Sequence, residues 1–414
     1  MSDRIQVPKG TFDVLGDDAL ARDALTDVAQ GILQRAGYER IETPAFEATE
    51  LFARGVGAST DIVQKEMYSF EDGAGRSLTL RPEGTAPICR AYMEHGMHKR
   101  AQPVKLWYLS SFFRAEAPQK GRFRQFWQIG AEAIGSDDPA VDAELICLLA
   151  ELLEAIGAQG VKLLIGSLGS IKARAAYREQ LQDYLRAHTD ELSAEVRERI
   201  ELNPLRAFDA DHPGTRAVMA GAPRLLDSLS AEDADHFSEV RALLDAAGVG
   251  YEVDTTLVRG IDYYTRTLFE FSSTALGSQS GVGGGGRYDG LVEQLGGPPT
   301  PGCGWAAGVE RMLMSSQQAA IAPPPVDLYV AAAEPEQRAA AFRLADDARR
   351  AGHGVRLELA GRSVKGVYKQ ANKVGARYVA VLGSDGVGLT DTESGARQTV
   401  DVETVMHHIR GGQL

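Results

Sequence analysis

The stretch Phe112-Phe113-Arg114-Ala115-Glu116, continued by Gly121-Arg122-Phe123-Arg124-Gln125-Phe126, decides the fold of this chain. Apolar residues dominate 104–113 and 126–134 on either side, which predicts two strands joined by a short basic loop. Arginine presents a flat fork of donors that fits phosphate oxygens and keeps its charge at any working pH. A distant Gly308-Val309-Glu310-Arg311 adds one more arginine at the start of a predicted helix. The stretch therefore predicts a strand pair with arginines in and beside the loop that joins the two strands.

Length and composition place the chain among ordinary globular proteins of two or three domains. It has 414 residues and a formal net charge of −13, which argues against general coating of nucleic acid and predicts no DNA partner. Local basic patches could still hold RNA. Its three cysteines are far apart and predict neither a disulfide framework nor a zinc knuckle. No apolar run of about 18 residues and no apolar segment after Met1 are present, so we expect a cytoplasmic protein without membrane contact.

The first three-quarters of the chain alternate between helical and strand patterns. Residues 17–36 predict an amphipathic helix, capped by Asp17 or Asp18, and Tyr38–Thr43 predicts the strand that follows it. Residues from about 168 to 246 are almost wholly helical and charged, which indicates an insertion between two halves of a sheet domain.

An Ala-Pro run at Ala319–Pro325 predicts a stiff linker to a small α/β domain. We therefore expect a core over residues 1–322 and a second domain over 323–414. Three buried-type strands alternate with two helices in that second domain, namely Val326–Ala332, Val355–Leu359 and Tyr378–Leu382 with helices at 335–351 and 363–375.

Two further segments resemble one family. Residues 257–270 (Leu-Val-Arg-Gly-Ile-Asp-Tyr-Tyr-Thr-Arg-Thr-Leu-Phe-Glu) and 283–291 (Gly-Gly-Gly-Gly-Arg-Tyr-Asp-Gly-Leu) resemble the two histidine-specific motifs of the histidyl-tRNA synthetases. Residues 80–85 and 118–122 are similar to the same family, which belongs to class II of the aminoacyl-tRNA synthetases. The resemblance implies an α+β fold: an antiparallel sheet flanked by helices, a helical insertion and a C-terminal α/β domain that binds the anticodon. The helix, strand and Pro44 near the N-terminus resemble class II motif 1 and imply a homodimer.

The implied reaction joins the carboxylate of L-histidine to the α-phosphate of ATP, expels pyrophosphate, and then transfers histidine to the 3′ end of tRNA(His). Two anions must approach each other, so cations are needed to offset their repulsion. By resemblance Arg114 and Arg259 are the catalytic cations, and Arg311 holds the γ-phosphate end. The implied ATP-binding residues are Arg114, Glu116, Arg122, Phe126 and Arg311, with Mg²⁺ as cofactor and Glu116 as one candidate to help place it.

A neutral imidazole has one donor and one acceptor nitrogen, which a carboxylate and a phenol can satisfy together. The resemblance implies that Glu132 and Tyr264 face this ring and that Glu83 takes the substrate ammonium. The implied histidine-binding residues are Glu83, Thr85, Arg114, Gln128, Glu132, Arg259, Tyr263, Tyr264 and Tyr288.

Contacts with tRNA are expected in two places. The family usually has arginine where this chain has Ala117, so the loop after Arg114 has lost a cation, and Gln119 and Lys120 remain as candidates. In the second domain a basic series without intervening acids is expected to touch phosphates, although an ordinary solvated face also fits its charge: Arg362, Lys365, Lys369 and Lys373.

Several competing interpretations are weaker. Gly281–Gly286 matches the dinucleotide pattern but follows no buried strand, so close backbone approach to an amino acid or a flexible loop fits better. His95 and His98 near Cys89 do not make a convincing zinc site, and we predict no metal-binding residues. An inactive regulatory paralogue, like the synthetase-like subunit of ATP phosphoribosyltransferase, is the main functional alternative, and a non-catalytic tRNA-sensing module is another.

Overall fold

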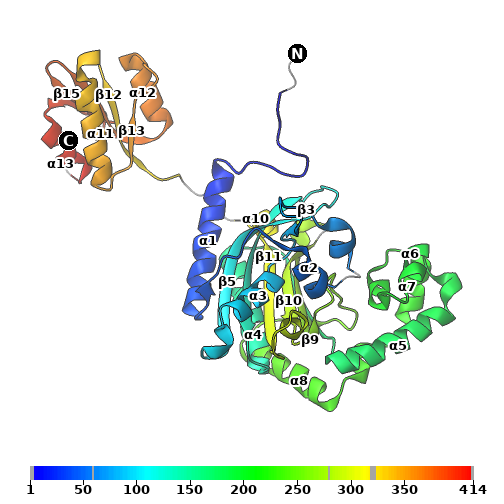
Figure 1. The fold of residues 1–414 in the computed structure, drawn as a ribbon. Helices are drawn as coiled ribbons and strands as arrows, with labels where there is room; N and C mark the ends of the chain where they lie inside the picture. Colours follow the sequence, from blue (N-terminus) through cyan, green and yellow to red (C-terminus); the bar gives the residue numbers. More distant parts are fainter. Residues whose placement is uncertain (1–3, 58–59, 278–279, 318–322, 412–414) are drawn as a thin grey trace. The chain divides into compact units, whose positions relative to one another are not determined.

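The computed structural model describes residues 4–57, 60–277, 280–317 and 323–411, and the chain separates into two compact units (Figure 1). Unit 1 is Met1–Ala320 and unit 2 is Ile321–Leu414. Most of the predicted Ala-Pro linker lies outside the described residues. No described helix is long and apolar enough to cross a membrane.

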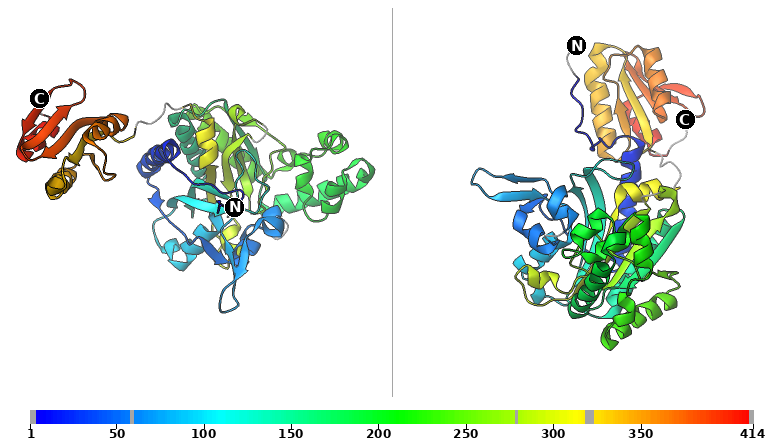
Figure 2. Two further views of the ribbon diagram at one scale, coloured as in Figure 1. Left: turned by 90° about the horizontal axis from the view of Figure 1, so that it is seen from above. Right: turned by 90° about the vertical axis from the view of Figure 1, so that its right-hand side faces the viewer.

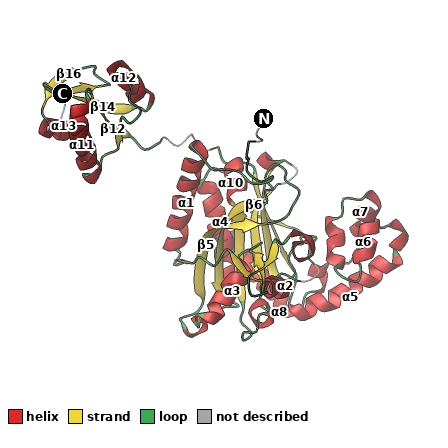
Figure 3. Ribbon diagram, turned by 45° about the horizontal axis from the view of Figure 1, so that its top comes forward, coloured by secondary structure: helices red, strands yellow, loops and turns green. Residues whose placement is uncertain are grey.

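An eight-stranded sheet forms the centre of unit 1 in the described part of the chain (Figure 3). Its inner strands are antiparallel, and the two short edge strands pair in parallel with their neighbours. Across the sheet the order is β1 (Glu39–Arg40), β5 (Val104–Phe113), β6 (Gln125–Ile134), β11 (Gly302–Gly308), β10 (Gly281–Arg287), β9 (Thr265–Ser273), β7 (Val161–Ser167) and β8 (Glu252–Val253). A smaller sheet contains β2 (Phe46–Ala48), β4 (Ser77–Leu80) and β3 (Ser69–Glu71).

Three helices pack on one face of the large sheet: α1 (Asp17–Arg35), α4 (Pro139–Ala155) and α8 (Ala231–Ala246). Helix α4 starts cleanly because the Asp138 side chain accepts a hydrogen bond from the Ala140 amide at 2.8 Å. The predicted cap of α1 is wrong: Gly16 occupies the cap position without a side-chain bond, and Asp17 and Asp18 lie in the first turn. There they still face the positive end of the helix dipole.

The predicted strand at Tyr38–Thr43 is shorter in the structure. Glu39 and Arg40 pair with β5 opposite Leu106 and Trp107, and the Ile41 amide adds one hydrogen bond to the Trp107 oxygen at 2.8 Å. Glu42 and Thr43 lie beyond the strand, and the buried Tyr38 before it packs into the core with α1 and α4.

The helical segment predicted at 168–246 divides into two parts with different roles. Helices α5 (Ile171–Ala187), α6 (Ala194–Arg199) and α7 (Pro213–Ala220) extend to one side of the sheet (Figure 2). Helix α8 instead packs against α4, with Phe237, Val240 and Leu244 buried in the main core. The part that stands outside the core therefore ends before Ala231, because the apolar side chains of α8 return to the sheet.

The glycine-rich segment is a central strand, β10, between β9 and β11. A Cβ at Gly284 would lie 2.5 Å from the carbonyl oxygen of Phe269, and one at Gly283 would lie 2.6 Å from the Ala307 methyl group. Glycine is therefore required by close packing in the sheet. This geometry excludes both the flexible loop and the dinucleotide-binding turn.

Unit 2 is a five-stranded sheet with helices. Within the described residues the strand order is β13 (Val355–Leu357), β12 (Val326–Ala332), β14 (Ala376–Gly383), β15 (Gly386–Asp391) and β16 (Arg397–Val400), with helices α11 (Arg338–Arg350), α12 (Val364–Lys373) and α13 (Val402–Ile409). The predicted strands and helices are present. The antiparallel pair β15–β16 and helix α13 were not predicted, because the exposed strand β16 lacks a continuous apolar run.

Candidate functional site

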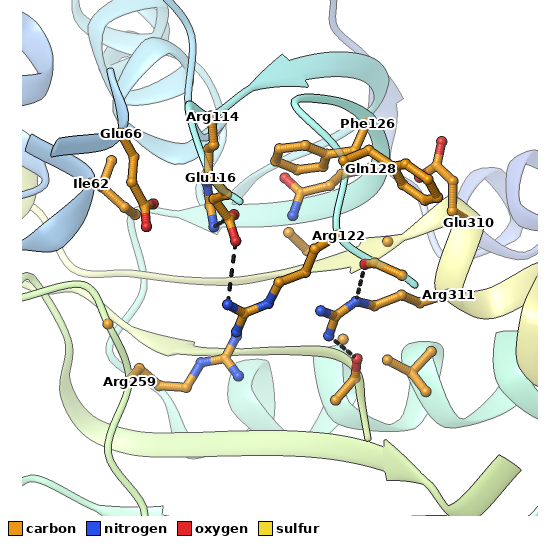
Figure 4. Close-up of a pocket in the computed structure, with 18 of the residues that line it drawn as sticks. Ile62, Glu66, Arg114, Glu116, Arg122, Phe126, Gln128, Arg259, Glu310 and Arg311 are labelled. Carbon is orange, nitrogen blue, oxygen red and sulfur yellow. Dashed lines mark hydrogen bonds and ion pairs between the residues drawn. The ribbon is translucent and has the colours of Figure 1, made fainter. Parts of the chain in front are cut away.

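A large pocket of about 560 Å³ opens on the face of the large sheet opposite α1 and α4 (Figure 4). We call it the large pocket. Strands β6, β9, β10 and β11, the loop after β5 and helix α10 (Val309–Ser315) supply most of its walls. Its charged and polar lining residues are Asp61, Glu66, Arg114, Glu116, Arg122, Gln128, Arg206, Arg259, Glu270, Ser280, Glu310 and Arg311.

Two of the predicted arginines are fixed by bonds to main-chain carbonyls. Arg114 leaves the end of β5 and donates from Nε to the Pro82 oxygen at 3.0 Å, with its guanidinium 5.3 Å from the Phe126 ring centroid. Arg311, in the first turn of α10, donates to the Gly121 oxygen at 2.9 Å and the Gly281 oxygen at 2.6 Å. Held in this way, both cations keep their direction without a ligand.

The other two predicted arginines of the large pocket are paired with carboxylates. Arg122 lies 3.4 Å from Glu116, and Arg259 donates to Glu270 at 2.5 Å. Burial and the neighbouring Arg122 charge lower the pKa of Arg311, because the two cations repel each other in a partly desolvated site. A bound polyanion would relieve this repulsion, which makes the large pocket suited to phosphate groups.

Arg124, quoted with the same motif, has a different task. Its Nε donates to the main-chain carbonyl oxygen of Glu116 at 3.2 Å, and its backbone amide donates to the carbonyl oxygen of Gly10 at 2.8 Å. It does not line the large pocket but fastens the loop after β5 to the N-terminal segment, where the rings of Phe12 and Phe123 contact each other at a tilt, with centroids 4.7 Å apart.

A small cavity of about 60 Å³ adjoins the large pocket, and both are lined by Arg114, Gln128, Arg259 and Ala306. The other polar residues around it are Glu83, Thr85, Tyr108, Tyr263, Tyr264 and Tyr288. All the predicted histidine-binding residues except Glu132 thus line one cavity. Glu132 lies directly behind it, where it accepts hydrogen bonds from the Thr85 and Tyr288 hydroxyls, each at 2.7 Å.

Two buried carboxylates give the small cavity its electrostatic character. Glu83 accepts from the amides of Thr85 at 2.8 Å and Ala86 at 3.1 Å, at the start of helix α3 (Thr85–Glu94). Burial raises its pKa all the same. Burial also raises the pKa of Glu132 to about 8, because two hydroxyl donors only partly replace water. A ligand that is cationic or donates hydrogen bonds would therefore stabilise both buried carboxylates.

The phenols of the cavity form one cluster. Tyr263 donates to Glu83 at 3.4 Å and contacts the rings of Tyr264 and Tyr288 at 4.8 and 5.8 Å. Burial raises the pKa of Tyr264 to about 12, so it remains a neutral donor and acceptor. A planar heteroaromatic group with two polar atoms suits such a lining.

Some lining residues were not predicted. Asp61, Glu66 and Arg206 reach the large pocket from a helical turn at 62–66 and from the insertion, so only tertiary structure brings them there. Glu270 and Tyr108 could have been found, since each lies in a predicted strand or motif. Tyr108 is buried and its hydroxyl has no partner among the described residues.

The predicted tRNA contacts are on the surface. Gln119 and Lys120 are exposed beside a shallow hollow shared with Gly10–Phe12. In unit 2, three lysines of α12 are exposed and the structure records no ion pair for them among the described residues: Lys365, Lys369 and Lys373. Arg362 differs, because Glu358 pairs with it at 2.9 Å.

Metal binding by the protein alone finds no support in the part of the chain that is described, where no group of three or more His, Cys, Asp or Glu could hold an ion.

A histidyl-tRNA synthetase family model matches residues 10–312, about three-quarters of the chain. The chain belongs to the histidyl-tRNA synthetase family.

Relatives that align with most of this chain carry the name of the same family. The chain is 46% identical to the histidine–tRNA ligase of Thermosynechococcus vestitus, covering 92% of this chain and 89% of that one. It is 45% identical to that of Rubrobacter xylanophilus, with 95% and 96% covered. The apo histidyl-tRNA synthetase of S. aureus superimposes with a TM-score of 0.81 at 32% identity and covers 98% of this chain and 100% of its own. The predicted α+β class II fold is thereby confirmed.

Proposed function

We propose that this synthetase activates L-histidine with ATP to histidyl-adenylate and pyrophosphate, then transfers histidine to the 3′ end of tRNA(His). One observation carries the proposal: a phosphate-suited large pocket and a small cavity lined by carboxylates and phenols share a wall that contains Arg114 and Arg259. The α-phosphate and the histidine carboxylate would meet at that wall.

Both arginines would act on the reacting groups. As the carboxylate oxygen attacks, negative charge builds up on the five-coordinate phosphorus and on the leaving pyrophosphate. Arg114 and Arg259 would stabilise that charge from two sides, and Arg259 would exchange its bond to Glu270 for one to the phosphate. Arg122 and Arg311 would bind the outgoing phosphates, and Phe126 would stack on adenine. Fixed donors of this kind need no reorganisation during the reaction.

Histidine would be recognised by its two ends. Glu83 would bind the ammonium group, with Thr85 and Gln128 completing that end of the site. Glu132 and Tyr264 would read the two imidazole nitrogens, and Tyr263 and Tyr288 would close around the ring. An amino acid without a matching nitrogen would leave buried polar groups unpaired, which is the strongest basis for rejecting it.

Mg²⁺ would enter with ATP. It usually keeps several waters and binds through one or two carboxylates and the substrate phosphates. Glu116 is the candidate from the protein, because it lines the large pocket next to Arg114 and Arg122. The ion would offset the negative charge of the phosphates.

Other partners follow from the same proposal. Gln119 and Lys120 would contact the acceptor end of tRNA. Unit 2 would bind the anticodon through the α12 lysines, with Arg362 contributing after release from Glu358. The N-terminal helix and strand would form a homodimer interface. Since charged tRNA is used in translation, the reaction would take place in the cytoplasm.

The alternative is a regulatory paralogue without catalysis. A Bacillus halodurans protein described as an ATP phosphoribosyltransferase regulatory subunit/histidyl-tRNA synthetase matches with a TM-score of 0.65 at 25% identity. The curated relatives at 45–46% identity are instead named histidine–tRNA ligases over nearly their whole length. Arginines at every expected position of the large pocket also favour catalysis.

Charging of a tRNA(His) transcript with radiolabelled histidine and ATP tests the proposal. The enzyme is expected to form acid-precipitable histidyl-tRNA, and a transcript for another amino acid is the control. A folded protein that binds histidine but charges no transcript would favour the regulatory alternative.

A further inference from the structure

The helical insertion is bonded directly to the loop that carries Tyr263 and Tyr264. This loop runs from β8 to β9 over residues 254–264, and its backbone leaves the sheet. On one side the amide of Asp262 donates to the Val56 oxygen at 3.2 Å. The other side contacts the insertion.

Arg174 makes the main contact from the first turn of α5. Its Nη1 donates to two carbonyl oxygens of the loop, that of Asp262 at 2.5 Å and that of Tyr264 at 2.9 Å. Its Nη2 also lies 3.7 Å from the Asp262 carboxylate. One guanidinium therefore clamps the backbone on both sides of Tyr263. No other part of the catalytic proposal uses this residue.

The base of the insertion fixes where α5 begins. Arg266, at the start of β9, exchanges backbone hydrogen bonds of 2.7 Å with Leu168 and Gly169, just before α5. It has a φ of 44°, the one positive φ recorded for a described residue other than glycine. Asp233 bonds both the Arg266 side chain at 3.1 Å and the Ser170 amide at 3.0 Å. The strained backbone is thus held by bonds to the same segment from which Arg174 extends.

A second bond from the insertion supports the same loop. The Asn203 amide group donates to the Asp262 carboxylate at 3.2 Å. Asp262 is therefore contacted by α5 and by the turn before 204–209 together. The insertion and the loop that carries the two tyrosines therefore form one hydrogen-bonded unit.

We propose that Arg174 is a positioning residue for histidine binding, through which the helical insertion holds Tyr263 and Tyr264 in the small cavity. The inference rests on the proposed function. Without Arg174 two loop carbonyls lose a charged donor, and the phenols lose their fixed direction toward the substrate ring. Arg114 and Arg311 of the large pocket are bonded to carbonyl oxygens outside this loop, so ATP binding is expected to depend less on Arg174 than histidine binding does.

Histidine-dependent ATP–pyrophosphate exchange, with each substrate varied in turn, tests the proposal on the full-length enzyme. Arg174→Ala is expected to raise the KM for histidine about tenfold, the effect of losing one charge-assisted hydrogen bond. The KM for ATP is expected to change less than about twofold, because the substitution weakens the binding of histidine alone. Arg174→Lys keeps the charge and is expected to recover part of the loss.

Arg178→Ala is the matched control. Arg178 lies one turn further along α5 and also donates to two carbonyl oxygens, those of Glu201 at 2.7 Å and Leu202 at 2.6 Å, but both lie inside the insertion. Its variant is expected to keep the wild-type KM for histidine within about twofold.

Three results would overturn the inference: an unchanged histidine KM in Arg174→Ala, equal increases in both KM values, or an equal effect of Arg178→Ala. If Arg174→Ala does not fold, the Arg174→Lys variant provides the test, because its KM for histidine can be compared with its KM for ATP in the same way. Absence of any histidine-dependent exchange in the wild type would instead contradict the proposed function.

Discussion

Replacing Glu132 by glutamine is expected to stabilise the protein at alkaline pH while disabling it. The Glu132 carboxylate is buried at the base of the small cavity and accepts hydrogen bonds from Thr85 and Tyr288. Glutamine has the same shape and no charge. Its amide can satisfy both hydroxyls, since a hydroxyl can turn to accept as well as donate.

The size of the effect follows from the pKa. Burial raises the pKa of Glu132 from 4.5 to about 8, a difference of 8 − 4.5 = 3.5 pH units. At 1.36 kcal/mol per unit this corresponds to about 5 kcal/mol. Between pH 4.5 and 8 the folded state holds a proton that the unfolded state has released. The free energy of unfolding of the wild type therefore falls by about 1.4 kcal/mol per pH unit in this window, and the glutamine variant lacks that loss.

Urea unfolding from pH 5 to 9, followed by tryptophan fluorescence, measures this difference. The chain has three tryptophans, Trp107, Trp127 and Trp305, which all belong to unit 1, so the signal reports on the unit that contains Glu132. Glu71→Gln is the control, because Glu71 is exposed in β3 and the structure records no hydrogen bond or ion pair for its side chain among the described residues.

The advantage of Glu132→Gln over the wild type is expected to grow up to about pH 8 and then to level off. Histidine-dependent pyrophosphate exchange measured at pH 9, where Glu132 is ionised, is expected to fall by about 100-fold, the value of one lost hydrogen bond to a charged group. Parallel pH profiles for the wild type and Glu132→Gln would refute this reasoning, as would a growing advantage in Glu71→Gln.

Three further predictions concern other parts of the molecule. Arg259→Ala is expected to lower the rate of adenylate formation by about 100- to 1,000-fold and to leave tRNA binding nearly intact. Adenylate formation that persists in rapid-quench assays would show that this cation is not catalytic. Asp142→Ala is expected to cost about 3–5 kcal/mol of unfolding free energy, because the fully buried Arg287 loses its ion pair at 2.5 Å and keeps only the longer one to Asp289 at 3.3 Å; a loss below about 1 kcal/mol in urea unfolding would contradict this. Replacing the three α12 lysines by glutamine is expected to reduce the slope of log Kd against log salt for tRNA(His) by about 2, and an unchanged slope would remove these lysines from the interface.

The sequence predicted the centre of the fold better than its edges. The strands β5 and β6 and the loop between them were predicted nearly to the residue, because long apolar runs flank a motif of fixed length. The N-terminal cap and the strand at Tyr38–Thr43 were less accurate. Short edge elements depend on tertiary pairing, and alternation alone cannot separate a paired strand from a packed extended segment.

The residues of the candidate site could be predicted from the sequence only where they belong to a motif that resembles a known family. Arg114, Arg259 and Arg311 lie far apart in the chain, and their resemblance to known motifs was the reason to expect them together. Asp61 and Arg206 had no such signal. They line the large pocket because the insertion folds back to pair them at 2.9 Å, and no local pattern encodes that contact.

ATP–pyrophosphate exchange with each amino acid supplied separately tests the central claim most directly. It requires the ATP site, the amino-acid site and the shared pair of arginines at once, and it does not require tRNA. We predict exchange with L-histidine and none above background with the other amino acids. Exchange with a different amino acid, or none with histidine in a folded protein that binds it, would contradict the account.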